Sequence, residues 1–327
     1  MKKITQKSIA RKLALSESTV SRALANSPLI GQETRRAVLQ EARRQGKVSR
    51  SNLVALLVPQ GMISGYFARV LSLLLDELHF MDYRPVVLCG WELELLDELD
   101  FCGAISVYSD NGLEKNWGRY RNIPLVCINT APNHLERIFS VSSNDGQAMQ
   151  LLLEHLIRQG HRRIGRIGLG CEPGKEMTFN RQARENHFCR IMDGYDLDTS
   201  LSGEVSGGSG SVLKQLQSRG ATAVILLDEG LDMEVLHTLH LSGIKVPEDL
   251  SVAGWSYPDT GACLLPELTA VEQDFPQLVR RSCDMLHRLL AGENVSKDVL
   301  VDYRFIKRFS TAARPQSAFP SGENGIF

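Results

Sequence analysis

The sequence contains no apolar run of the ~18 residues that a membrane-spanning helix requires. No apolar segment follows the basic first residues, so a secretory signal is not expected. The seven cysteines are scattered and include no C-x-x-C pair, a pattern that favours reduced thiols over a disulfide framework or a zinc site. We therefore expect a cytoplasmic protein with no membrane segment and no bound metal.

Motifs for catalysis are also missing. The sequence has no G-x-S-x-G and no H-E-x-x-H, and residues 169–176 lack the first glycine of a phosphate-binding loop. His237 and His240 have a spacing that a metal can use, but no partner cluster accompanies them. The paired carboxylates are typical of solvated helix faces and turns. We predict no catalytic residues and no cofactor, and hence no enzyme.

The charge is nearly balanced overall but is distributed unevenly. Residues 1–50 contain twelve Lys and Arg and three acids, whereas the rest of the chain contains more acids than bases. A basic segment on an acidic body indicates that only this segment meets a polyanion such as nucleic acid.

Three short helices are predicted in the basic segment. The first runs from Gln6 to Leu13 and is capped by Thr5, and the second runs from Glu17 to Leu24 and is capped by Ser16. A third is expected from Gln32 to Gln45. Short helices joined by tight turns are typical of a helix-turn-helix unit, whose second helix lies in the major groove of DNA.

The second helix offers few side chains that can select bases. Arg22 can pair with guanine through two hydrogen bonds, and Glu17 can accept a hydrogen bond from a cytosine amine. Hydroxyl groups and a lysine can bind phosphates, although simple helix capping is an equal alternative for each Ser and Thr. The predicted DNA-contacting residues are Thr5, Ser16, Glu17, Ser18, Thr19, Ser21, Arg22, Thr34 and Lys47.

This segment resembles the headpiece of the LacI/GalR repressors. The specific part is A-L-S-E-S-T-V-S-R-A-L, from Ala14 to Leu24. Ala14 departs from the family, which usually has glycine in this turn. If the residue has a positive φ, alanine costs about 1 kcal/mol of stability.

Short apolar runs alternate with helical patterns after Asn52, which predicts α/β units with parallel sheets. The expected strands are Leu53–Val58, Pro85–Cys89, Gly103–Tyr108, Leu125–Asn129, Ile164–Leu169, Ala223–Leu227, Leu250–Gly254 and Val299–Ile306. The expected helices are Tyr66–His79, Asp145–Gln159, Thr178–Asp193, Ser211–Arg219, Leu231–Ser242 and Pro276–Leu290.

The same region resembles the LacI/GalR effector domain, which is similar to periplasmic sugar-binding proteins. Matching segments include H-L-I-R-Q-G-H-R-R-I-G from His155, V-P-E-D-L-S-V-A-G-W from Val246 and L-P-E-L-T-A-V-E-Q-D from Leu265. We expect a headpiece over 1–48, a short linker over 49–52, an effector and dimerisation domain over 53–315 and a disordered tail over 316–327. The domain is expected to divide into one lobe of about 53–160 and 257–291 and another of about 161–256 and 292–315.

The resemblance implies a sugar or glycoside bound between these lobes, beyond the carboxyl ends of the strands. The residues that it brings to this site are Tyr66, Phe67, Asn144, Asp145, Arg181, Asp228, Trp255 and Ser256. Arg181 and Asp228 are the strongest candidates, with a surface ion pair as the alternative. Ser256 stands where the family usually has aspartate, which indicates an altered ligand.

The resemblance therefore predicts a ligand-controlled repressor that binds double-stranded operator DNA as a homodimer or tetramer. Local features around residues 171–188 are similar to the subgroup that contains the evolved β-galactosidase repressor. The alternative is a sugar-binding or sugar-processing enzyme with a basic N-terminal extension.

The linker is shorter than the family pattern. The Pro-Asn and Ala-x-x-Leu of the usual hinge helix are absent, and Gly46 to Asn52 lead almost directly into the first strand. Seven residues span at most ~25 Å. We therefore expect no leucine wedge in the minor groove and little bending of the operator.

Overall fold

The computed structural model describes residues 5–24, 27, 29–44, 51–59, 65–89, 94–107, 117, 123–129, 138–170 and 177–314. Lys47, residues 49 and 50 of the predicted linker and the predicted disordered tail lie outside these residues. Within the described ranges, no helix is long and apolar enough to cross a membrane. Nor do any three His, Cys, Asp or Glu side chains of these ranges form a group that could hold a metal ion.

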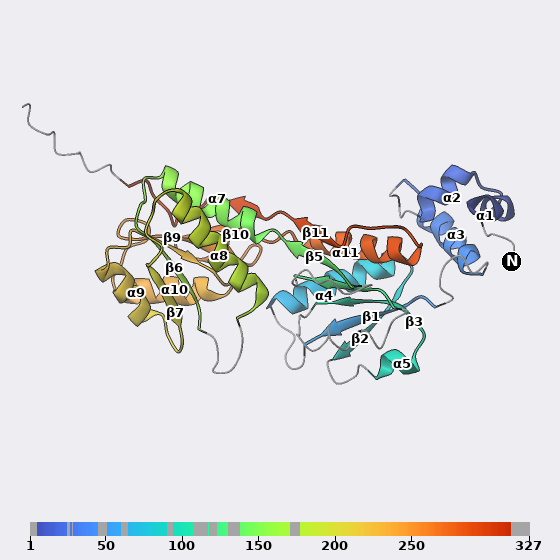
Figure 1. Cartoon of the computed structure of the whole chain (residues 1–327), viewed down its shortest axis with the longest axis horizontal. Helices are drawn as coiled ribbons and strands as arrows, with labels where there is room; N and C mark the ends of the chain where they lie inside the picture. The colour runs from blue at the N-terminus through green and yellow to red at the C-terminus, as the bar shows by residue number, and fades with distance from the viewer. Residues whose placement is uncertain are drawn as a thin grey trace, which may run out of the picture. The chain divides into compact units, whose positions relative to one another are not determined.

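The headpiece consists of three helices, α1 (Gln6–Leu13), α2 (Glu17–Leu24) and α3 (Gln32–Arg44), as expected from the sequence (Figure 1). Their apolar residues recur at helical spacing, so that each helix turns one stripe inward. The small shared core is formed by Ile9, Ala10, Val20, Ala23, Leu24, Val38 and Ala42.

The chain divides into two compact units. Unit 1 comprises Met1–Ser143 and Asp274–Val301, and unit 2 comprises Asn144–Gln273 and Asp302–Phe327. The chain therefore crosses from one unit to the other three times. Each unit contains a six-stranded sheet, and the two sheets share no strand.

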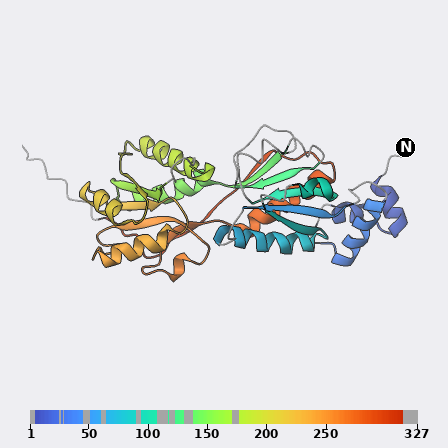
Figure 2. The same ribbon diagram turned by 90° about the horizontal axis from the view of Figure 1, so that it is seen from below.

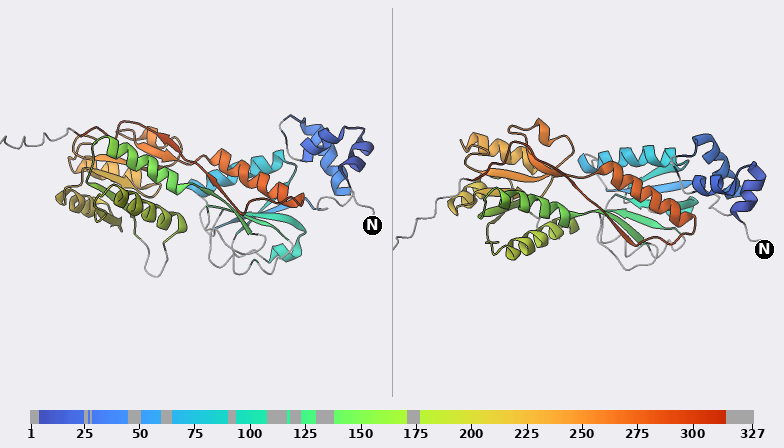
Figure 3. Two further views of the ribbon diagram at one scale, coloured as in Figure 1. Left: turned by 45° about the horizontal axis from the view of Figure 1, so that its top comes forward. Right: turned by 90° about the horizontal axis from the view of Figure 1, so that it is seen from above.

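The sheet of unit 1 has the strand order β11-β5-β4-β3-β1-β2, and all of its pairs are parallel. Its strands are β1 (Leu53–Val58), β2 (Arg84–Cys89), β3 (Phe101–Ser106), β4 (Leu125–Ile128), β5 (Ile138–Ser143) and β11 (Asp298–Val301). Its helices are α4 (Gly65–Phe80), the short α5 (Leu95–Glu98) and α11 (Phe275–Leu290). Helices α4 and α11 pack side by side (Figure 3).

The sheet of unit 2 has the order β12-β10-β9-β8-β6-β7, and only the pair of β10 with β12 is antiparallel. Its strands are β6 (Ile164–Leu169), β7 (Ser202–Val205), β8 (Ala223–Leu226), β9 (Ser251–Ser256), β10 (Thr269–Glu272) and β12 (Arg304–Ile306). Its helices are α7 (Asp145–Arg158), α8 (Phe179–Gly194), α9 (Gly210–Ser218), α10 (Leu231–Leu241) and the 3-10 turn η2 (Gly261–Cys263).

Helices cover both faces of this sheet (Figure 2). Along β8, Ala223 and Ile225 belong to the cluster that contains α7 and α8, whereas Val224 and Leu226 belong to the cluster that contains α9 and α10. This alternation explains why the strand is apolar at every position, as parallel strands with two covered faces usually are.

The unit boundaries differ from the predicted lobes. The predicted first lobe extended to about residue 160, but the chain leaves unit 1 after Ser143, and α7 packs on α8 in unit 2. The predicted strand Val299–Ile306 is in fact two strands, because β11 pairs with β5 of unit 1 and β12 pairs with β10 of unit 2. Strands β5, β7 and β10 were not predicted.

Candidate functional site: a polar helix face and a buried charge network

The first turns of α2 present polar side chains to solvent. Ser16 caps the helix by accepting a hydrogen bond from the backbone N of Thr19 at 3.0 Å, and its hydroxyl also bonds the hydroxyls of Ser18 (2.8 Å) and Thr19 (2.7 Å). Glu17 and Arg22 are exposed and form no side-chain hydrogen bond or ion pair with another described residue. Their charges therefore remain available to an external partner.

The turn before α2 contains a residue with a positive φ. Ala14 has φ 53° and ψ 36°, and its backbone N–H bonds the carbonyl of Ala10. This left-handed conformation is the one that glycine adopts at low cost, so alanine is under strain here. Ala14 thus has the positive φ for which the sequence analysis expected alanine to cost about 1 kcal/mol of stability.

Arg35 supports the loop between α2 and α3 and also reaches unit 1's α4. It is 2% exposed, and its Nη2 donates to the carbonyls of Ser27 (2.8 Å) and Ile30 (3.3 Å). Its guanidinium lies 4.9 Å from the centre of the Phe80 ring at the end of α4. Burial raises the pKa of nearby Glu77 on α4, an effect that the charges of Arg280 and Arg35 oppose.

A histidine of α11 bonds the end of α2. Nε2 of His287 contacts the carbonyl oxygen of Leu24, and Nδ1 lies 2.9 Å from the hydroxyl of Tyr83. Because a carbonyl only accepts, Nε2 must carry the proton, and Nδ1 of the neutral ring then accepts from Tyr83. Burial lowers the pKa of His287, which favours this neutral form. The headpiece thus contacts α4 and α11 of its own unit.

In unit 1, two predicted effector residues lie in the first turn of α4, directly after β1. The hydroxyl of Tyr66 accepts a hydrogen bond from Nδ2 of Asn129 at 3.1 Å, and the Tyr66 ring makes edge contacts with Phe67 and Phe275. Asn129, which follows β4, was not predicted from the sequence. Its Oδ1 accepts from the backbone N of Ser143 at 2.8 Å.

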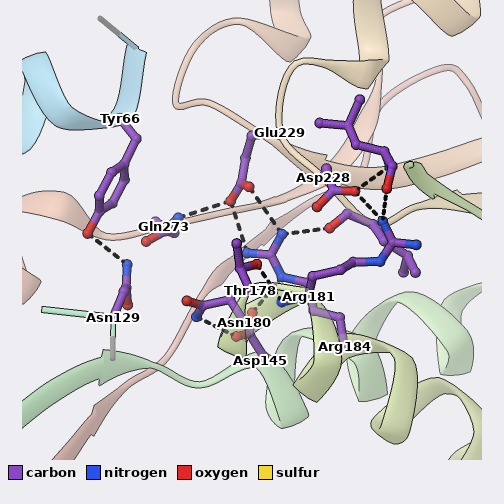
Figure 4. A network of polar contacts seen from close by, with 12 residues as sticks. Tyr66, Asn129, Asp145, Thr178, Asn180, Arg181, Arg184, Asp228, Glu229 and Gln273 are labelled. Atoms are coloured by element: carbon purple, nitrogen blue, oxygen red, sulfur yellow. Dashed lines mark hydrogen bonds and ion pairs between the residues drawn. The ribbon is translucent and has the colours of Figure 1, made fainter. Parts of the chain in front are cut away.

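In unit 2, the centre of the polar network is Arg184 of α8 (Figure 4). Its Nε donates to Asp145 (2.8 Å), its Nη1 to the Leu227 carbonyl (2.6 Å) and Glu229 (3.1 Å), and its Nη2 to Glu229 (3.1 Å) and the Tyr303 hydroxyl (3.2 Å). A guanidinium has five N–H groups, so all of them are used.

Opposite charges keep this buried network ionised. Burial alone would lower the pKa of Arg184, but Glu229 and Asp145 raise it well above its ordinary value. Burial would likewise raise the pKa of Glu229, but Arg184 and a hydrogen bond from Gln273 lower it. Burial beside Asp145 raises the pKa of Tyr303, which therefore stays a neutral hydrogen-bond donor. Glu229 therefore acts as an acceptor rather than as a proton donor.

Arg181, one turn before Arg184, forms a second set of ion pairs. Its Nη1 donates to Asp228 at 2.5 Å and its Nη2 to Glu185 at 2.8 Å. The guanidinium lies over β6 at Gly168, where a Cβ atom would be only 1.5 Å from Nη1. The two strongest sequence candidates, Arg181 and Asp228, are thus bonded to each other.

Three other predicted effector residues have structural partners. Trp255 is fully buried, with the Arg184 guanidinium 4.5 Å from its ring centre. Ser256 is buried and donates to Asp232 of α10 at 2.8 Å, so a carboxylate is present beside this position although the family's aspartate is not. Asn144 caps α7 and donates to Asp302 at 2.8 Å.

The sequence analysis predicted some of the residues of this network and missed others. Asp145, Arg181 and Asp228 were named, but Arg184 and Glu229 were not. Glu229 immediately follows Asp228 at a strand end, and Arg184 is three residues after Arg181 on the same helix, so both spacings were available as signals. Of the predicted DNA-contacting residues, Lys47 lies outside the described part of the chain.

The known sequences that this chain resembles cover most of its length. Residues 153–311 match the periplasmic binding protein-like domain family. The repressor PurR of Serratia proteamaculans is 24% identical, with 95% of this chain and 98% of PurR covered. The repressor CytR of Escherichia coli K12 is 26% identical, with 95% of this chain and 97% of CytR covered.

Solved structures show the same fold. A lac repressor dimer bound to operator and an anti-inducer has a TM-score of 0.70 at 19% identity, covering 95% of this chain and all of that one. A LacI-family regulator of Enterococcus faecium with bound ribose has a TM-score of 0.67 at 21% identity, covering 80% of this chain and all of that one.

Proposed function

Because this chain is a member of the LacI/GalR family of transcriptional regulators, we propose that it is a cytoplasmic repressor which binds operator DNA and responds to a sugar-like effector. The observation that carries the proposal is the polar face of α2. Its exposed Glu17 and Arg22 project from a three-helix unit in the basic part of the chain and have no partner among the described residues.

This face suits the major groove of DNA. The capped start of α2 presents Glu17, Ser18 and Arg22 together, and these side chains can reach base edges when the helix lies in the groove. Thr5 and Ser16 use their oxygens to cap helices, and the Thr19 hydroxyl bonds that of Ser16. The remaining hydrogen-bonding capacity of these hydroxyls suits phosphate oxygens. We infer that Arg22 selects a base and that the hydroxyl groups orient the headpiece.

The effector is assigned to the residues at the carboxyl ends of the strands, where open α/β sheets bind ligands. In unit 2 these residues are Asp145, Arg181, Asp228 and Glu229, and in unit 1 the residue is Tyr66. The solved relatives with ribose or cellobiose bound support a sugar as the ligand class. Trp255 and Ser256 then act as buried supports of the site rather than as direct contacts.

The alternative of a sugar-processing enzyme has less support. Glycoside hydrolysis needs one carboxyl group with a raised pKa to protonate the leaving group. Glu229 has a lowered pKa because of Arg184, and Asp145 is held by the same guanidinium. This pair of carboxylates therefore suits binding, not acid catalysis.

A homodimer follows from the need for two half-sites, because a single headpiece makes few base contacts. Unit 2 offers one surface for it. Met233 and Leu241 of α10 are 61% and 72% exposed, and Leu265 is 89% exposed. Met233 and Leu265 line the same apolar groove. We assign this surface to a second copy of the chain.

The test is selection of binding sites from random DNA with the full chain, followed by footprinting of the selected site. The proposal expects two protected half-sites related by two-fold symmetry, bound by a dimer. A single asymmetric half-site bound by a monomer, or no enrichment of any sequence, would reject it.

A further inference from the structure

The last residue of α2 is held by a side chain of α11. The carbonyl oxygen of Leu24 accepts a hydrogen bond from Nε2 of His287, and the Tyr83 hydroxyl donates to Nδ1 of the same ring at 2.9 Å. His287 is 5% exposed and Tyr83 is 4% exposed, so both bonds are shielded from water. Because the last carbonyls of a helix have no partner within it, the Leu24 carbonyl is open to an outside donor. Unit 1 supplies that donor on a ring that Tyr83 holds in one orientation.

A second contact lies at the start of α3. Arg35 is buried, and its guanidinium lies 4.9 Å from the centre of the Phe80 ring at the end of α4. The same guanidinium donates to the carbonyls of Ser27 and Ile30, which belong to the loop between α2 and α3. Burial lowers the pKa of Arg35, and the negative charge of Glu77 on α4 opposes this effect. The headpiece therefore contacts α11 and α4 at two separate points.

Helix α11 extends from these contacts to the point where the chain enters unit 1 from unit 2. It has 16 residues and is therefore about 24 Å long. At its first residue, the Phe275 ring makes an edge contact with the Tyr66 ring, with 5.7 Å between the ring centres. Two residues earlier, Nε2 of Gln273 donates to Glu229 at 2.9 Å. Tyr66 and Glu229 are among the residues assigned to the effector. One helix thus begins beside these residues and carries His287 near its end.

The segment between the headpiece and β1 offers little other means of holding the headpiece. Gly46 to Asn52 lack the Ala-x-x-Leu of the family's hinge helix, and seven residues span at most ~25 Å. A headpiece held by such a tether alone would sample many positions. The contacts of Leu24 and Arg35 instead give it one position on unit 1.

We propose that His287 is a positioning residue for operator binding. Through its bond to Leu24, α11 holds α2 in a fixed position on unit 1, and a shift of α11 at its first residue moves α2 with it. Leu24 is seven residues after Glu17, so the bond lies only ~10 Å along the helix from the side chains assigned to DNA. This inference rests on the proposed function and names the contact by which unit 1 controls the headpiece.

Fixed headpieces make a dimer selective for the distance between two half-sites. Each base pair added at the centre of an operator separates the half-sites by about 3.4 Å and rotates one against the other by about 35°. Headpieces held by His287 cannot follow this change, so the full chain should lose about 100-fold in affinity when two base pairs are inserted. Headpieces released from unit 1 can follow it and keep their contacts with both half-sites.

The test measures the affinity of full-chain variants for the selected operator and for operators lengthened by one to four base pairs. His287→Leu removes the donor and should bind the selected operator about tenfold more weakly, because a loosely tethered second headpiece has a lower effective concentration at its half-site. Its further loss on insertion of two base pairs should be less than about fivefold. His287→Gln keeps an N–H group at the end of the side chain and should restore the strict spacing. His79→Leu is the control, because His79 is exposed on α4, and it should leave the spacing preference unchanged.

A strict spacing preference in His287→Leu would overturn the inference. If that variant bound neither operator nor random DNA, the decision would pass to Tyr83→Phe, which removes only the hydroxyl that orients the ring. Tyr83→Phe should tolerate the two-base-pair insertion at least about fivefold better than the unaltered chain, and an unchanged preference would overturn the inference. An unaltered chain that selects no operator would refute the proposed function instead.

Discussion

The headpiece leaves Arg22 exposed and without an ion pair among the described residues, whereas unit 2 buries Arg184 among two carboxylates, a carbonyl and a tyrosine hydroxyl. Both residues are arginines on helices, but only Arg22 was named from the sequence, as a DNA contact. The difference lies in how much of their hydrogen-bonding capacity the fold has already used.

The two regions therefore differ in whether the charged side chain is hydrogen-bonded to water or to other protein groups. The polar face of the headpiece keeps its donors in water, so that a polyanion can replace the water at little cost. The network in unit 2 satisfies the donors of Arg184 internally, which makes this side chain part of the fold. The same residue type is thus left exposed in one region, where we propose that it binds DNA, and is built into the folded structure in the other.

The largest effect is expected where a buried charge loses its partner. Arg184→Met should destabilise unit 2 by about 3–5 kcal/mol, because Asp145 and Glu229 would remain buried without their cation. The free energy of unfolding, measured by urea denaturation, checks this. Arg158→Met is the control, because Arg158 is 78% exposed in its pair with Glu154 and should change stability by less than about 0.5 kcal/mol. If the two substitutions lowered the free energy of unfolding equally, the expected difference between a buried and an exposed arginine would be contradicted.

The next effect concerns the core of the headpiece. Ile9→Ala should cost about 2–4 kcal/mol, because Ile9 is fully buried in a small core with seven buried members among the described residues. We expect loss of operator binding with an unchanged response of unit 2 to its effector. DNA binding and thermal stabilisation are measured on the same sample, with Leu29→Ala (78% exposed) as the control. Joint loss of both activities would show that the two regions do not fold separately.

Arg22→Ala tests whether the exposed arginine selects a sequence. Loss of a base contact should cost about 1–3 kcal/mol on the operator and little on random DNA. Lys47→Ala is the comparison and should weaken binding to both DNAs alike. Affinities at several salt concentrations decide this, and equal losses on both DNAs for Arg22→Ala would argue against its assignment.

A smaller effect of opposite sign is expected in the turn before α2. Ala14→Gly should stabilise the headpiece by up to about 1 kcal/mol, because glycine accepts the φ of 53° without a clash. The melting temperature of the headpiece, followed through its DNA binding, should rise. A decrease would show that the flexibility gained by the unfolded chain outweighs the relief of strain.

The smallest effect concerns the shape of the DNA. The short linker and the contact of Leu24 with His287 support a headpiece held near its own unit, so the operator should be bent little. Circular-permutation assays measure the bend. A central kink of ~40°, within the range that inserted apolar wedges produce, would contradict this expectation.

The headpiece helices and the α/β class were predictable from the sequence, because capping residues and apolar spacing are local signals. Strands β5, β7 and β10 were missed, since their sequences (IFSVSS, SGEV and TAVE) mix polar residues with the apolar ones and so lack the apolar run that predicted the other strands. The division of Val299–Ile306 was not predictable from its apolar pattern, because Asp302 and Tyr303 look like ordinary strand residues. Arg184 was missed since its importance comes from Asp145, Glu229 and Tyr303, which are brought together only by the fold.

The most direct test of the account measures the affinity of the full chain for its selected operator and for random DNA, each with and without a small-molecule fraction of cells that carry this gene. The account predicts at least about a 1,000-fold preference for the operator. It also predicts that the fraction changes operator affinity by about 5–150-fold, the usual range of coupling between two sites. Equal affinity for the two DNAs, or an operator affinity that the fraction leaves unchanged, would contradict it.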